Sequence, residues 1–299
     1  MANPTRDTTA GRIYNDLRNL ARRTGRPSDQ LMLEYVLERF LFRLSYHPEG
    51  GRHFVLKGGL LLAQFGARRM TRDIDILGRS FSGDEGEITR RIAAIAATEA
   101  DDGVVFDSTS LSVVPIRQDD EYHGLRLTMA ASLSRARLKL QLDVSFGDPV
   151  TPEPELIDYP QTLEGTPFPL YGYPIATVIA EKLSTAVALG DLNTRDRDYA
   201  DLHQLITRHR LDGSELIDAL TATAEHRAIR LRPLSSAITD LPTRRQAPYT
   251  AWLRRQGPSA EDHPGNLTEL VALVADFADP LLTGTATQRI WEPQARAWT

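Results

Sequence analysis

The chain has 299 residues, of which 41% are hydrophobic and 25% charged, so it can bury a sizeable core without covalent cross-links. It contains no cysteine, which excludes disulfides and thiolate metal ligands. The polar N-terminal residues lack a signal-peptide core, and no uncharged apolar run approaches the roughly 20 residues that span a bilayer. We therefore expect a cytoplasmic protein with no membrane partner.

The distribution of charge is more informative than its sum. The formal net charge of -5 does not indicate nucleic-acid binding, yet residues 1–80 hold 14 Lys and Arg against 8 Asp and Glu. Two interpretations remain open. This basic region faces a polyanion, or it consists of arginine-rich helices exposed to solvent.

Apolar spacing predicts two helices at the N-terminus. Over residues 11–24 the apolar side chains recur on one helical face, and Gly25 ends the helix. Ser28 is expected to cap a second helix that continues through Leu44. The many apolar positions of this second helix indicate that it is largely buried.

A region rich in strands follows. The apolar run 54–56 predicts a buried strand, the glycines after it predict a tight turn, and a short helix is expected directly after them. Residues 72–77 predict a second strand, and residues 86–100 a helix. Further strands are expected at residues 104–114, 124–131 and 138–144. The last of these alternates, with leucines on one face and Lys139, Gln141 and Asp143 on the other.

The C-terminal half is predicted to be mainly helical. Residues 151–173 hold many prolines and are expected to form an extended connector. Helices are expected over residues 174–189, 195–209, 214–229 and 266–278. This order of elements predicts an α+β fold with two lobes. Residues 1–150 form a lobe with a mixed sheet and N-terminal helices, and residues 174–299 form a helical C-terminal lobe.

The strongest chemical signal is Lys57-Gly58-Gly59 followed by Asp73-Ile74-Asp75. Residues i and i+2 of a strand point to the same face, so the two carboxylates repel each other and need a compensating cation. Mg²⁺ prefers one or two carboxylates together with phosphate oxygens. Glycines before a helix let backbone N–H groups approach those phosphates. Asp143, on the polar face of its strand, fits as a third ligand. Together these parts describe a metal-bound triphosphate attacked in line by a hydroxyl.

Each of these parts has an ordinary structural explanation. A pair of aspartates often sits in a solvated turn, a glycine pair is usually only a turn, and Asp143 could simply end a strand. The specificity lies in the order: strand, glycine turn, helix, strand with two aspartates, later strand with one aspartate.

Several stretches resemble a known family. They occur in family order at residues 54–59, 69–76, 142–150, 179–183 and 195–202. Their arrangement is similar to the DNA polymerase β-like nucleotidyltransferase fold. More closely, it resembles the AbiEii/AbiGii toxins of type IV-style toxin–antitoxin pairs, which include the mycobacterial MenT toxins. Many relatives of the wider fold have Gly-Ser where this chain has Gly58-Gly59, so backbone N–H groups must bind phosphate here.

The resemblance also implies roles for two helical motifs. Lys182 would meet the charge of the triphosphate, although by itself it could be an ordinary surface lysine. Asp198 or Asp201 would belong to the site, with Arg195 or Arg197 near phosphate. The alternative is a plain ion pair between Arg197 and Asp201 one helical turn apart. Which of the two acids is essential stays open.

Two residues near the glycine turn and the aspartate pair are further candidates. Lys57 could reach phosphate or only anchor the loop. Thr71 is either a hydroxyl that caps a turn or, as in toxins that the chain resembles, a site whose phosphorylation stops activity. A phosphate there would repel the incoming triphosphate, capture the metal, or pair with Lys57, Arg69 or Arg72.

The resemblance implies a toxin that uses Mg²⁺ or Mn²⁺ to transfer nucleotides from an NTP to RNA, with the tRNA 3′ acceptor end favoured. The C-terminal lobe would contribute to the active-site cleft, and a cognate antitoxin would be a partner. One alternative is transfer to a protein or a small molecule. Another is an inactive scaffold that binds an NTP or the antitoxin, which the intact aspartate trio argues against. The choice of NTP, the number of nucleotides added and the oligomeric state stay open.

Overall fold

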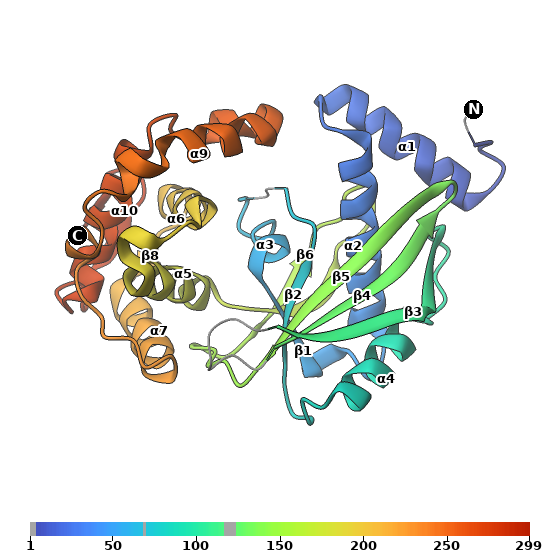
Figure 1. Ribbon diagram of the computed structural model, residues 1–299, viewed down its shortest axis with the longest axis horizontal. Coiled ribbons are helices and arrows are strands. Elements are labelled where there is room, and N and C mark those ends of the chain that lie inside the picture. Colours follow the sequence, from blue (N-terminus) through green and yellow to red (C-terminus); the bar gives the residue numbers. More distant parts are fainter. Residues whose placement is uncertain (1–3, 68–69, 117–123) are drawn as a thin grey trace. The chain divides into compact units, whose positions relative to one another are not determined.

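The computed structural model is described here for residues 4–67, 70–116 and 124–299 (Figure 1). The chain divides into two compact units. The first comprises residues 1–147 and 155–172, and the second comprises residues 148–154 and 173–299. The chain therefore passes from one unit to the other three times. Among the described residues, no helix is both long and apolar enough to cross a membrane.

The first unit is built around a mixed sheet of seven strands in the order β3-β4-β5-β2-β1-β7-β6. The strands are β1 Phe54–Lys57, β2 Ile74–Gly78, β3 Val104–Ile116, β4 Gly124–Leu133, β5 Ala136–Phe146, β6 Glu155–Tyr159 and β7 Phe168–Gly172. Strand β2 runs parallel to β5, and β1 runs parallel to β7, while the other neighbours are antiparallel. This sheet confirms the predicted α+β class.

The helices of the first unit follow the predicted order. They are α1 Thr9–Thr24, α2 Ser28–Tyr46, α3 Gly58–Leu61 and α4 Glu85–Ala96. Helix α1 ends at Gly25, which adopts the left-handed conformation that glycine tolerates. The expected capping role of Ser28 is wrong. Pro27 occupies the cap position of α2 without a side-chain hydrogen bond, and its fixed φ directs the chain into the helix at Ser28.

Helices α1 and α2 bury one face of the long strands. The shared core contains Tyr14, Leu17, Ala21, Leu31, Met32, Tyr35, Val36, Val104, Ala131 and Leu133. A buried ion pair fastens α2 to the segment before β3. Arg43 Nη1 lies 2.6 Å from Asp102 Oδ2, and Arg43 Nη2 lies 3.1 Å from Asp102 Oδ1. Because this face of the sheet is filled by the core, polar side chains of β4 and β5 must lie on the other face.

Residues 151–173 are more than the expected extended connector. They contain β6 and β7, which pair with each other and extend the sheet beyond β1. Proline usually argues against a strand because it cannot donate to a ladder. Here Pro160 and Pro167 flank the strands. Pro169 lies within β7, whose pairing with β1 is confined to Leu56 and Gly172. The missing N–H of Pro169 therefore weakens the pairing between β7 and β1 little.

The second unit is mainly helical. Its helices are α5 Ile175–Leu189, α6 Asp196–Arg208, α7 Gly213–His226, α8 Leu234–Ala237, α9 Leu241–Gln256 and α10 Leu267–Leu282. A small sheet in the order β10-β9-β8 joins β8 Leu211–Asp212, β9 Ile290–Glu292 and β10 Ala297–Trp298. The expected start of α5 after Pro174 and its end at Gly190 are confirmed. Helices α8 and α9 and the small sheet were not expected.

The end of the chain fastens the second unit. The indole N–H of Trp291 donates to the Ile206 carbonyl of α6 at 2.7 Å, and that of Trp298 donates to the Phe277 carbonyl of α10 at 3.0 Å. Both tryptophans are buried and pack against the Phe277 ring. The C-terminal hairpin thereby holds α6 and α10 together, and α6 carries the candidate residues Arg197, Asp198 and Asp201.

Candidate active site

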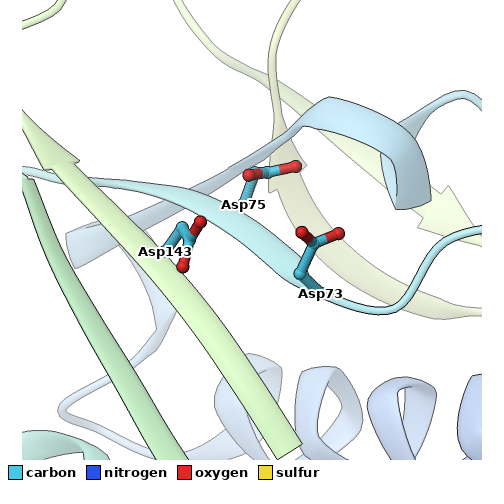
Figure 2. A group of neighbouring side chains, drawn as sticks. All are labelled: Asp73, Asp75 and Asp143. Carbon is cyan, nitrogen blue, oxygen red and sulfur yellow. The ribbon is translucent and has the colours of Figure 1, made fainter. Parts of the chain in front are cut away.

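Three aspartates meet on adjacent strands of the first unit. Strands β2 and β5 are in register so that Asp75 lies opposite Asp143, and Asp73 directly precedes β2. One carboxylate oxygen from each residue lies within 4.8 Å of the others, and all three residues are partly exposed. Figure 2 shows the three side chains projecting from the same side of the two strands. The predicted convergence of Asp73, Asp75 and Asp143 is therefore present in the structure.

Alternation along both strands explains why the carboxylates share a face. Ile74 pairs with Leu142, and Ile76 pairs with Val144, and all four side chains are buried. In a strand, the residues between such core positions must point the other way. The apolar residues thus orient the acidic ones.

The glycine turn lies directly against this cluster. Strand β1 pairs with β2 so that Lys57 is opposite Asp75. Gly58 follows with a φ of +66°, and a Cβ added there would lie 1.9 Å from Asp75 Oδ2. The turn therefore approaches the carboxylate as closely as a backbone can. Lys57 is half-buried, and Gly59 is buried at the start of the four-residue helix α3.

Arg126 is a member of the site that the sequence analysis missed. The β4–β5 register places it opposite Asp143, and its guanidinium forms two hydrogen bonds to that carboxylate. The distances are 2.8 Å from Nε to Oδ1 and 2.6 Å from Nη2 to Oδ2. Hydrogen bonding to Asp143, assisted by the nearby charges of Asp73 and Asp75, raises the pKa of Arg126 above its usual value. The alternation of Leu125, Arg126 and Leu127 places Arg126 on the polar face of its strand, but only the register of β4 against β5 sets it opposite Asp143.

Thr71 contacts the cluster from the segment before β2. It is 6% exposed, and its hydroxyl donates to Asp73 Oδ1 at 2.8 Å. This hydrogen bond orients the carboxylate of Asp73. Lys57, Arg69 and Arg72 are the cations expected to pair with a phosphate on Thr71. Of these, Arg69 lies outside the described residues.

The cluster suits a hard divalent cation. Mg²⁺ and Mn²⁺ prefer oxygen ligands, and three carboxylates on two neighbouring strands provide them from one direction. Three negative charges this close repel one another, and Arg126 forms its ion pair with Asp143. The donor set therefore fits the predicted metal, with Asp73, Asp75 and Asp143 as ligands.

The second unit holds a compact charge cluster of its own. The ammonium of Lys182 on α5 donates to Asp198 Oδ1 at 2.9 Å and to Asp201 Oδ2 at 2.7 Å. All three side chains are nearly buried, with side-chain exposures of 12%, 13% and 3%. Asp198 and Asp201 sit one turn apart on α6, so both can face the same lysine. Lys182 is thus not an ordinary surface lysine.

The two arginines of this motif are placed differently. Arg195 precedes α6, is half-buried, and donates its backbone N–H to Asn193 Oδ1 at 2.8 Å. Arg197 lies in the first turn of α6 and is exposed. The roles expected for both near phosphate stay predictions. A neighbouring acid that was not singled out, Asp196, forms a two-point ion pair with Arg245 of α9 at 2.8 and 2.7 Å.

A mixed sheet with three carboxylates beside a glycine turn defines a nucleotidyltransferase-like protein. Two solved structures share the fold. JHP933 from Helicobacter pylori matches with a TM-score of 0.52 and 15% identity, covering 86% of this chain and 94% of that chain. The nucleotidyltransferase toxin MenT4 from Mycobacterium tuberculosis matches with a TM-score of 0.51 and 17% identity, covering 90% and 97%. A comparison with curated proteins finds no match.

The family model for the nucleotidyl transferase AbiEii toxin of type IV toxin–antitoxin systems matches residues 39–279. The match covers most of the chain, which therefore belongs to the AbiEii family of nucleotidyltransferase toxins. The family predicted from the sequence motifs is confirmed. Membership implies an NTP as substrate and an antitoxin as partner.

Proposed function

We propose that this toxin transfers nucleotides from an NTP to RNA in a metal-dependent reaction, and that the 3′ acceptor end of tRNA is its favoured acceptor. The observation that supports the proposal best is the convergence of Asp73, Asp75 and Asp143 beside Gly58. An RNA 3′ end provides the hydroxyl that such a reaction requires.

In the proposed reaction, the 3′ hydroxyl oxygen of the RNA attacks the α-phosphorus of the NTP. A new phosphodiester bond forms, the bond from the α-phosphorus to the bridging oxygen of the β-phosphate breaks, and pyrophosphate leaves. When bound by the three aspartates, Mg²⁺ or Mn²⁺ would polarise the triphosphate and lower the pKa of the attacking hydroxyl. Asp143 is the candidate that takes the hydroxyl proton. Arg126 donates a hydrogen bond to each oxygen of Asp143. One of these hydrogen bonds must therefore break before Asp143 can accept the proton.

The remaining residues of the proposal act on the triphosphate. We propose that backbone N–H groups of Gly58 and Gly59 donate to phosphate oxygens, and the close approach of this turn to Asp75 supports this role. We assign Lys57 to the negative charge of the triphosphate, and the role of Lys182 there stays a prediction. A charge fixed in place stabilises a transition state without the cost of reorienting water.

The proposed RNA acceptor is supported by charge. Residues 1–80 hold 14 Lys and Arg against 8 Asp and Glu, and this excess of positive charge is compatible with a nucleic-acid backbone. The trio of carboxylates argues against an inactive scaffold that only binds an NTP or the antitoxin. Transfer to a protein or to a small molecule is the competing enzymatic activity.

The test uses the full-length protein, total RNA, and each of the four labelled NTPs with Mg²⁺. We expect label in RNA of tRNA size with the wild-type protein. Asp75→Asn should reduce transfer by at least about a thousandfold, because loss of a metal ligand costs several kcal/mol. Asp107→Asn, which removes an exposed carboxylate of β3, is the matched control and should transfer normally. Label in protein or in small molecules instead of RNA would refute the proposed acceptor.

A further inference from the structure

The side of the sheet that carries Asp143 continues along β4 and β5 as an accessible strip. We call this strip the open face. Its members are Arg126, Thr128, Ala130 and Ser132 of β4, and Arg137, Lys139, Gln141 and Asp143 of β5, paired across the two strands. Each of them is partly or fully exposed. Their neighbours in the sequence point to the core beneath α1 and α2.

Charge changes sign along the open face. At one end lies the acidic trio, and at the other end lie the exposed cations Arg137 and Lys139. Small or uncharged polar side chains lie between. On the adjoining strand β3, Asp107 pairs with Ala130, and its Oδ1 accepts hydrogen bonds from the N–H and hydroxyl of Thr109 at 3.1 and 2.6 Å. That carboxylate is thus turned toward its own strand.

The dimensions of the face suit a short single strand of nucleic acid. Asp143 and Arg137 are six positions apart on β5, which is about 20 Å at the rise of a β-strand. A stacked single strand that rises roughly 3.4 Å per nucleotide covers this length with about six nucleotides. A 3′ hydroxyl at Asp143 would therefore place the phosphates of the preceding nucleotides over Lys139 and Arg137.

We propose that the open face is the track on which the single-stranded 3′ end of the RNA acceptor lies. This inference rests on the proposed function and adds the surface that holds the acceptor. Lys139 and Arg137 attract the phosphodiester backbone, while Thr128, Ser132 and Gln141 offer uncharged hydrogen-bonding groups beside it. Phosphate contacts fix the register of a strand but carry little sequence information. The track therefore binds many sequences and is sensitive to salt.

The test compares two double variants of the full-length protein. Arg137→Gln with Lys139→Gln removes the two cations of the track. Arg22→Gln with Arg23→Gln removes two exposed cations from α1, which covers the opposite face of the sheet. The probe is a labelled 12-nucleotide single-stranded RNA ending in CCA-3′, and its affinity is measured by fluorescence anisotropy with Ca²⁺ at several salt concentrations.

We expect the track variant to bind the 12-mer about tenfold more weakly, and its dependence of log Kd on log salt to be shallower by about 1.4. Its affinity for the NTP and its kcat at saturating RNA should stay within about twofold of wild type. The α1 variant should lose clearly less RNA affinity. For the trinucleotide CCA, which is too short to reach Arg137, the track variant and the wild type should bind alike.

Three outcomes would overturn the track. The two double variants could lose RNA affinity equally, which would mean that net charge alone matters. The track variant could bind RNA as tightly as the wild type while the wild type extends RNA normally. This result would refute the track but not the proposed function. It could also differ in oligomeric state by light scattering, with RNA affinity unchanged, which would make the open face an interface between copies. If the wild type neither binds nor extends RNA, the proposed function itself fails.

Discussion

At Gly58 the backbone passes so close to Asp75 that only a hydrogen fits. We predict that Gly58→Ala abolishes nucleotide transfer, since the added Cβ would lie 1.9 Å from Asp75 Oδ2 and must displace that carboxylate. Gly66→Ala is the matched control. Gly66 has a similar φ of +69°, but an added Cβ meets nothing within 4 Å. Both variants should lose about 1 kcal/mol of stability from the positive φ.

Transfer assays and Mn²⁺ binding by the two glycine variants separate these effects. Only Gly58→Ala should lose metal affinity. If both variants are equally active, the turn does not set the position of Asp75.

Thr71 is the residue through which the site could be regulated. We predict that Thr71→Glu is inactive, because a negative charge at this position would lie beside Asp73, whose Oδ1 accepts a hydrogen bond from the Thr71 hydroxyl at 2.8 Å. Thr71→Ala should keep much of the activity. Since Thr71 is 6% exposed, a kinase could reach it only after the segment before β2 moves outward.

Mass spectrometry of the toxin co-expressed with its antitoxin tests whether Thr71 is modified. A silenced toxin with unmodified Thr71 would point to a different mode of neutralisation.

The acidic residues of the site could be predicted from the sequence, whereas Arg126 could not. Asp73 and Asp75 are two positions apart, and Asp143 lies in a segment where leucines alternate with polar residues, so local periodicity places each on a polar face. The position of Arg126 depends on the register of β4 against β5, which is a relation between segments. Local patterns report the face of a residue but not its partner across the sheet.

On the scale of elements, Lys182 joins α5 to α6 through Asp198 and Asp201. We predict that Lys182→Ala destabilises the protein by about 3 kcal/mol, because it removes the ammonium group that pairs with two nearly buried carboxylates. It should also abolish transfer. A loss of activity alone would not distinguish structure from catalysis.

The triple variant Lys182→Ala, Asp198→Asn and Asp201→Asn distinguishes the structural role of Lys182 from a catalytic one, because it also removes the two carboxylate charges. Urea unfolding should show that most of the lost stability returns while transfer stays absent. If the triple variant transfers nucleotides as well as the wild type, the proposed role of Lys182 at the triphosphate is wrong.

Elements with a strong apolar period were predicted, and the missed ones lack such a period. Helices α1, α2, α5 and α10 were placed correctly to within a few residues. Helix α9 contains Pro248 and buries only Leu241, Tyr249 and Leu253, so its sequence carries little helical signal. The prolines around β6 and β7 led to the prediction of a connector, although the rest of the sheet stabilises two strands there. In each case tertiary contacts outweighed local preference.

On the scale of the whole molecule, we predict that stability falls in mild acid. Burial lowers the pKa of His203 on α6 to about 4, with further contributions from His263, Arg296 and Arg208. The unfolded chain binds this proton near pH 6.5, so the contribution is complete above that pH and is lost between pH 6.5 and about 4. Between pH 7.5 and 5.0 this residue should remove about 2 kcal/mol from the free energy of unfolding.

Urea unfolding at the two pH values measures that loss. His203→Gln should reduce it, leaving the smaller share of His263, whose pKa burial also lowers. An unchanged pH dependence in His203→Gln would assign the acid sensitivity to other groups.

The parallel pairing of β2 with β5 also determines when a newly made chain can become toxic. Asp73 and Asp75 leave the ribosome well before Asp143, which follows roughly 70 residues later, or about 4–14 s at ordinary rates of synthesis. A nascent chain that ends before β5 has two of the three aspartates and lacks the third. Products of the gene that end before β5 should therefore be unable to transfer nucleotides. An antitoxin needs to intercept only chains that have been synthesised beyond this point.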